Sequence, residues 1–230
     1  MRRVVRSRLE MGRSVLAFQK AHMDLSPGSP AAVDALAATL AEAESVSVEQ
    51  QEGMRHARAA TARKVGIRRD LNAMHLIHIA RAGQAAAREV PELEQVFEFT
   101  RGHLPYETFR TRALALAQSA GTHRELLVKY GLSEEMIQGL VDLVAQFDAA
   151  VAEGLDASRA HIGATARLEE LSERVVEQVG VMDGLNRYRF RDDRERLAEW
   201  GSVSQVVDRR REAVKEKEPP VPGSDVRPAA

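Results

Sequence analysis

Residues 128–140 read VKYGLSEEMIQGL, and this short stretch carries the signals for both the end of one helix and the start of the next. Gly131 suits the left-handed conformation that ends many helices. Ser133 can accept a hydrogen bond from a backbone amide of the following turn, and Glu134 and Glu135 favour the positive end of a helix dipole. The stretch therefore predicts two helices joined by a tight turn.

A similar arrangement occurs 104 residues earlier, in the stretch DLSPGSPAAVDAL at residues 24–36. Pro27 and Gly28 interrupt the chain, and Ser29 can cap the turn that follows. Pro30 suits a first helical position, because its missing N–H is not needed there. Two helix starts in the same register favour an internally duplicated helical unit.

Other short repeats share this offset of 104 residues. The tetrapeptide ATAR occurs at residues 60–63 and again at 164–167, and VRSR at 5–8 resembles FRTR at 109–112. Few residues are identical between the two segments as a whole. The duplication is therefore predicted from the common helical register rather than from identity.

Apolar residues recur every three or four positions along most of the chain, which is the period of an α-helix. No alternating run of β-branched residues competes with this pattern. The sequence predicts an all-α protein, an elongated antiparallel helical bundle. Its expected helices lie near residues 2–24, 29–52, 54–87, 104–129, 133–153 and 156–187, and the alternative for 29–87 is one long, bent helix.

The expected helices divide into two pseudo-equivalent three-helix halves. We expect the first half at residues 1–90, a linker with at most one helical turn at 91–104, and the second half at 105–208. The charged and Pro-rich segment 209–230 predicts a disordered tail. No stretch of 18 consecutive apolar residues occurs, so we expect a soluble, cytoplasmic protein without a membrane-spanning helix.

Composition excludes several classes of chemistry. The chain has no cysteine, which excludes disulfides, thiolate catalysis and Cys-ligated metals. Its 33 basic and 34 acidic residues nearly balance, so no overall positive field would attract nucleic acid. No Gly-rich phosphate loop and no Gly-x-Ser-x-Gly motif occurs. We therefore expect a protein that is not an enzyme and holds no cofactor.

The segment MHLIHIARAG contains His75 and His78, three positions apart and so on one face of a helix. Such a pair can present two imidazoles to one metal ion. The apolar neighbours instead favour hydrogen-bonded histidines at a contact between helices. No carboxylate lies three residues before any histidine, which excludes the usual di-iron pattern of helical bundles.

Residues 183–200, DGLNRYRFRDDRERLAEW, concentrate aromatic and arginine side chains. The preferred interpretation is a docked C-terminal segment, in which Gly184 relaxes the preceding helix and Asp192 or Asp193 caps a helix at 194–200. If the chain between these helices is extended, Tyr188 and Phe190 point to the same side. The second interpretation is a protein-contact site. Its candidate residues are Arg187, Tyr188, Arg189, Phe190 and Trp200.

Two clusters of basic residues could contact nucleic acid. They consist of Arg2, Arg3, Arg6 and Arg8, and of Arg63, Lys64, Arg68 and Arg69. Basic runs of this kind are more often solvated helix faces, because nucleic-acid binding needs a net basic surface.

Together these patterns predict a non-enzymatic helical-bundle protein that acts through protein–protein contacts and self-associates as a homo-oligomer. The first alternative is a helical bundle that binds a metal or cofactor through His75 and His78. The second alternative is a nucleic-acid-associated protein that uses the local arginine clusters.

Overall fold

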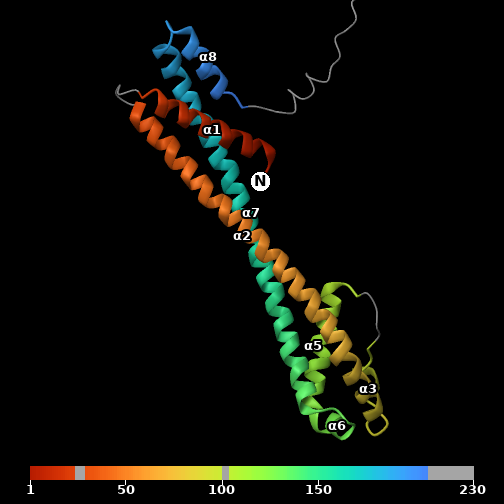
Figure 1. Cartoon of the computed structure of the whole chain (residues 1–230). Coiled ribbons are helices and arrows are strands. Elements are labelled where there is room, and N and C mark those ends of the chain that lie inside the picture. Colours follow the sequence, from red (N-terminus) through yellow and green to blue (C-terminus); the bar gives the residue numbers. More distant parts are fainter. Residues whose placement is uncertain (24–28, 100–103, 207–230) are drawn as a thin grey trace, which may run out of the picture. The chain divides into compact units, whose positions relative to one another are not determined.

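The computed structural model describes residues 1–23, 29–99 and 104–206 (Figure 1). The predicted tail at 209–230 and the chain break at Pro27 and Gly28 lie outside the described residues. All regular structure within those ranges is helical, which confirms the all-α prediction. The elements are α1 (Arg3–Ala21), α2 (Ser29–Asp70), the π-helical segment η1 (Leu71–Leu76), α3 (Ile77–Ala86), α4 (Leu93–Val96), α5 (Tyr106–Thr122), α6 (Arg124–Lys129), α7 (Glu134–Arg189) and α8 (Arg194–Val203).

The turn at residues 128–140 has the predicted local structure. Gly131 has a φ of 93°, the left-handed conformation that only glycine adopts at little cost. The Ser133 hydroxyl accepts a hydrogen bond from the Met136 amide at 3.1 Å, and α7 begins at the next residue after the serine. At the related position α2 begins at Ser29, as predicted.

The two longest helices run further than the sequence indicates. Residues 29–86 form one continuous helical run, in which only η1 is π-helical and the rest is α-helical. The single-helix alternative for 29–87 is therefore correct. The predicted break between 153 and 156 is wrong, because α7 continues through it. Gly154 at this point costs a helix only about 1 kcal/mol relative to alanine. A Cβ built on Gly154 would lie 3.5 Å from the Cβ of Ala60 in α2.

Contacts divide the chain into two compact units that differ from the predicted halves 1–90 and 105–208. Unit 1 combines Met1–Glu49 with the chain from Gly163 onward, and unit 2 is Gln50–Ile162. Helices α2 and α7 contribute residues to both units. With 42 and 56 residues they are about 63 and 84 Å long, whereas α1 has 19 residues and covers about 28 Å, so one short helix cannot cover either of them.

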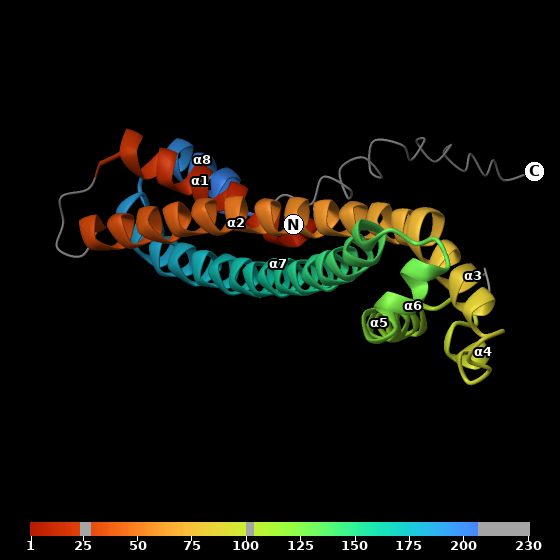
Figure 2. The same ribbon diagram turned by 90° about the horizontal axis from the view of Figure 1, so that it is seen from below.

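Unit 1 contains α1, the first part of α2, the last part of α7, and α8. Helices α1 and α8 lie side by side (Figures 1 and 2). A Cβ built on Gly12 would lie 2.6 Å from Val175, so α1 needs a glycine where it meets α7. The core consists of apolar side chains from all four helices, among them Leu9, Phe18, Leu36, Leu168, Val175 and Trp200.

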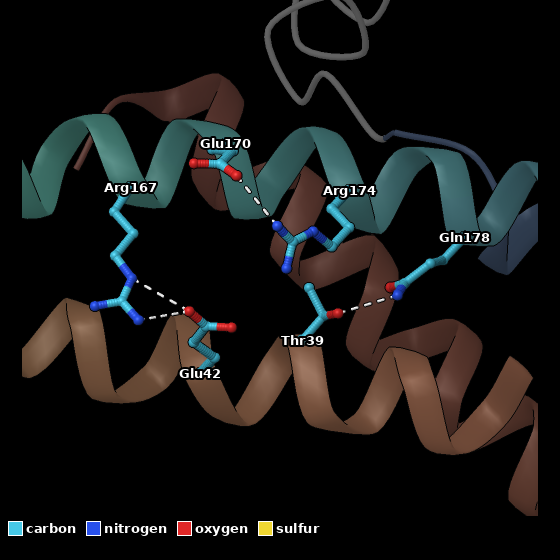
Figure 3. A network of polar contacts seen from close by, with 6 residues as sticks. All are labelled: Thr39, Glu42, Arg167, Glu170, Arg174 and Gln178. Atoms are coloured by element: carbon cyan, nitrogen blue, oxygen red, sulfur yellow. Dashed lines mark hydrogen bonds and ion pairs between the residues drawn. The ribbon is translucent and has the colours of Figure 1, made fainter. Parts of the chain in front are cut away.

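Polar contacts hold α2 and α7 together in antiparallel orientation within unit 1 (Figure 3). Gln178 donates to the Thr39 hydroxyl at 3.0 Å, and Arg167 donates to Glu42 at 2.7 Å. From the first pair to the second, the residue number in α2 increases from 39 to 42, while the residue number in α7 decreases from 178 to 167. Such a reversal is the mark of an antiparallel pair.

Unit 2 contains the rest of α2, η1, α3 to α6, and the first part of α7. Its aromatic side chains pack together: Tyr106 stacks on Phe147 with ring centroids 5.0 Å apart, and Phe109 meets Phe147 edge-on at 5.6 Å. The short helix α4 lies in the predicted linker 91–104, where at most one helical turn was expected. The fully buried residues include Leu71, Leu76, Ile79, Phe97, Leu127 and Leu140.

Candidate histidine sites and interaction surfaces

His75 lies in η1 and is half-buried against α7. Its Nδ1 is 3.1 Å from the Met136 carbonyl oxygen, which can accept a hydrogen bond from the Nδ1–H tautomer. A Cβ built on Gly139 would lie 2.9 Å from the imidazole Cε1, so the ring occupies space that only glycine leaves. The imidazole thus bridges η1 to the main chain of α7, in agreement with a hydrogen-bonded residue at a helix contact.

His78 lies in α3, and its side chain is exposed. The two histidines therefore have different surroundings, one packed against a neighbouring helix and one in solvent. Among the residues that the structure describes, no group of three or more His, Asp or Glu side chains comes together in a way that could hold a metal ion. Metal binding by His75 and His78 stays a prediction.

His161 of α7 makes a contact similar to that of His75, and the sequence analysis does not predict it. Its Nδ1 lies 3.0 Å from the Gln50 carbonyl oxygen of α2. A Cβ built on Gly53 would be 3.1 Å from the His161 backbone nitrogen, so the two helices approach closely here. Gly53 is the signal in the sequence that could have indicated this contact. In unit 2, two imidazoles thus reach main-chain carbonyls of the opposite long helix.

The aromatic and arginine stretch 183–200 folds onto the core of unit 1. Phe190 and Trp200 are buried, and the Phe18 ring centroid lies 5.9 Å from that of Phe190 and 5.4 Å from that of Trp200. Asp193 caps α8, because its carboxylate accepts a hydrogen bond from the Arg196 amide at 3.1 Å. This is the cap predicted from the sequence, and it agrees with the docked interpretation.

The other candidates in this stretch remain close to the surface. Arg189 donates to the carbonyl oxygens of His22 and Met23, at 2.9 and 3.0 Å, and so binds the chain that follows α1. The expectation that Tyr188 and Phe190 point to one side was wrong, because α7 stays helical through Arg189 and residues two apart then diverge. Tyr188 is 73% exposed.

Asp183 joins α7 to α8. Its carboxylate accepts hydrogen bonds from the Trp200 indole N–H at 2.8 Å and from Arg187 at 2.7 Å. Partial burial raises the pKa of the Asp183 carboxyl, but these two hydrogen bonds and the charge of Arg187 outweigh it, so that the pKa lies below its usual value. The carboxylate is thus ionised at neutral pH and serves as a structural acceptor.

Both arginine clusters take part in contacts within the chain. In the first cluster, Arg2 pairs with Glu169 at 2.8 Å and Arg8 with Glu173 at 3.7 Å. In the second, Arg63 pairs with Glu153 at 2.6 Å. The contacts of its other members are Lys64 over the Tyr106 ring, Arg68 with the Leu104 carbonyl oxygen and the Phe109 ring, and Arg69 with Asp70.

Several large apolar side chains of both units face solvent. In unit 1, Val181, Leu185 and Tyr188 of α7 are 65%, 49% and 73% exposed. Their spacing of four and three residues places them along one side of the helix. In unit 2, an open hollow of about 590 Å³ lies between α2 and α7, lined by Met54, Ala57, Arg58, Thr61, Ala62, Val65, Ser158 and His161.

Comparisons with known proteins return no relative: no family model, no curated protein and no solved structure matches this chain. Within the described ranges, no helix combines the length and the apolar character needed to cross a lipid bilayer.

Proposed function

We propose that this protein acts through protein–protein contacts, without catalysing a reaction, and that it self-associates. The observation that supports this proposal best is the exposure of large apolar side chains on well-formed helices. Val181, Leu185 and Tyr188 share one side of α7 and are 65%, 49% and 73% exposed. Contiguous apolar surface of this kind on a folded protein usually marks a contact with another molecule.

These side chains serve no purpose in the core of their own unit. The buried positions of the same part of α7 are Val175, Val179 and Met182, whose centre lies about 120° around the helix axis from that of the exposed set. Transfer of apolar surface from water into a contact contributes about 25 cal/mol per Å². Covering the exposed side of α7 would therefore stabilise an assembly without disturbing the unit's core.

Sedimentation equilibrium of the purified chain tests the proposal. Over a range of about 1 to 200 μM, we expect the mean mass to rise from that of one chain toward a small multiple of it. The rise should survive 0.5 M NaCl in part, because apolar contacts are not screened by salt. A mass equal to one chain at every concentration would contradict self-association.

A further inference from the structure

The last turns of α7 present an exposed side that points directly away from the core of unit 1. An α-helix turns by 100° per residue, so Gly180, Gly184 and Tyr188 lie opposite the buried Val175 and Met182. Val181 and Leu185 are exposed along one edge of this side. We call the residues of α7 from 173 to 188 on this side the α7 outer face.

The two glycines leave a strip of bare backbone in the middle of the α7 outer face. A Cβ built on Gly180 or Gly184 would meet no atom within 4 Å, so neither glycine is needed for packing inside unit 1. Each weakens the helix relative to alanine, because glycine loses more backbone freedom on folding. Helix axes usually pack 8–10 Å apart, depending on the side chains at the contact, and two glycines four residues apart permit the closer end of that range.

Charges of opposite sign lie at the two ends of the α7 outer face. Glu173 and Glu177 are exposed before the glycines, and Arg187 is exposed after them. Arg187 also pairs with Asp183 at 2.7 Å, but a guanidinium has five N–H donors and can bind a second carboxylate. Glu173 lies 3.7 Å from Arg8, at the outer limit of an ion pair.

This order of residues is complementary to itself when the helix is reversed. If two copies of α7 meet in antiparallel orientation at the level of residue 182, Glu177 of one copy faces Arg187 of the other, and Gly180 faces Gly184. Arg191 lies beyond the end of α7, where it pairs with Asp192 at 3.2 Å, and it takes no part in this register. A parallel pair in register would instead place each glutamate beside its own equivalent, where like charges repel.

We propose that the α7 outer face binds the same face of a second copy of this chain in antiparallel orientation, which gives a closed dimer with two-fold symmetry. This inference rests on the proposed self-association and names the surface that mediates it. The glycines form the crossing point, and Tyr188 of each copy packs on Val176 of the other. The glutamate and arginine pairs flank this contact and set the orientation.

Charge reversal tests the orientation. Glu177→Arg turns both Glu177–Arg187 pairs between the copies into arginine with arginine, and Arg187→Glu turns both into glutamate with glutamate. We therefore expect each variant alone to dimerise at least about tenfold more weakly. An equimolar mixture of the two variants restores both pairs and should form a heterodimer as tight as the wild type within about threefold. Glu44→Arg, on an exposed position of α2, is the control for net charge.

A glycine substitution tests the crossing point. Gly184→Gln fits in the single chain, because the site is open, and it should raise the thermal stability of the monomer through better helix propensity. In the dimer the same side chain would separate the helices, so we expect dimerisation to weaken at least about tenfold. Gly163→Gln, also at an open site on α7, should stabilise the helix equally and leave dimerisation unchanged.

Three outcomes of sedimentation measurements are distinguishable. Weak dimers of the single variants, a restored heterodimer and unaffected controls would support the inference. Wild-type dimers that Glu177→Arg and Gly184→Gln leave intact would overturn this surface but keep the proposed self-association. A wild type that stays monomeric would overturn both.

Discussion

At the scale of single residues, two imidazoles fix the contact between the long helices of unit 2. The sequence marks His75 because of its apolar neighbours, and a hydrogen bond at a helix contact is what the structure shows. Its acceptor is the main-chain carbonyl of Met136, which every residue possesses. A side-chain pattern cannot identify such a partner, and for the same reason it does not predict the contact of His161 with the Gln50 carbonyl. The opposing glycines, Gly139 and Gly53, are the only local signals.

The two histidines of the MHLIHIARAG segment should respond differently to substitution. His75→Ala removes the hydrogen bond to Met136 and leaves a cavity beside Gly139, so we expect a loss of about 1–3 kcal/mol in the free energy of unfolding. His78→Ala alters an exposed side chain and should change it by less than about 0.5 kcal/mol. Urea unfolding measures both, and equal losses would contradict the different surroundings described above.

Asp183 predicts a loss of stability in acid. Its pKa in the folded chain is below the value of about 3.9 for an unfolded aspartate, so its contribution is complete above pH 4 and is lost as the pH falls through the folded pKa. Asp183→Asn keeps an acceptor for Trp200 but carries no charge. We expect this variant to melt below the wild type at pH 7, with the gap closing below about pH 4. A gap that is constant with pH would exclude a role for the charge.

At the scale of elements, helix starts were predicted better than helix lengths. Gly131 and Ser133 act through their immediate neighbours, so their effect is visible in the sequence. The continuation of α7 through Gly154 and the π-helical segment η1 depend on packing between distant segments. One glycine costs a helix about 1 kcal/mol, which tertiary contacts easily offset. The sequence predicts that the segment with Phe190 and Trp200 docks on the protein, but no pattern in it identifies Phe18 as the contact.

The contact between α3 and α4 depends on one glycine. A Cβ built on Gly83 would overlap the ring of Phe97, which is fully buried. We therefore expect Gly83→Ala to lower the free energy of unfolding by about 1–3 kcal/mol, although alanine is the better helix former. Gly66→Ala, at an open site of α2, should instead raise it by about 0.5–1 kcal/mol. Thermal unfolding of both variants checks the sign, and a gain at Gly83 would show that Phe97 can move aside.

At the scale of the whole molecule, the two units show why the predicted halves are not the units of packing. Helix α2 starts at Ser29 and α7 at Glu134, within one residue of the spacing of 104 that the sequence predicts. Each long helix then supplies residues to both units, so a half defined by sequence lacks part of each core. The duplication itself stays a prediction, since periodicity locates helices but not the partners on which they fold.

Fragments of the chain should reflect the units rather than the halves. Residues 50–162 contain the apolar core of unit 2 from Ile67 to Ala150. We expect this fragment alone to be helical and to unfold cooperatively. Residues 1–90 lack Leu168, Leu171 and Val175 of the unit 1 core and should melt without a cooperative transition. Circular dichroism and calorimetry distinguish the two. A cooperative transition in fragment 1–90 would contradict the division at residues 49 and 163.

Unit 1 is built from two separate segments of the chain, and this affects how it folds during synthesis at the ribosome. Leu9 and Phe18 of α1 cannot reach their buried positions until Leu168 and Trp200 have left the exit tunnel. At about 5–20 residues per second, translation of the intervening chain takes roughly 10–40 s. During this interval the apolar stripe of α1 lies open to other nascent chains, whereas unit 2 can already close.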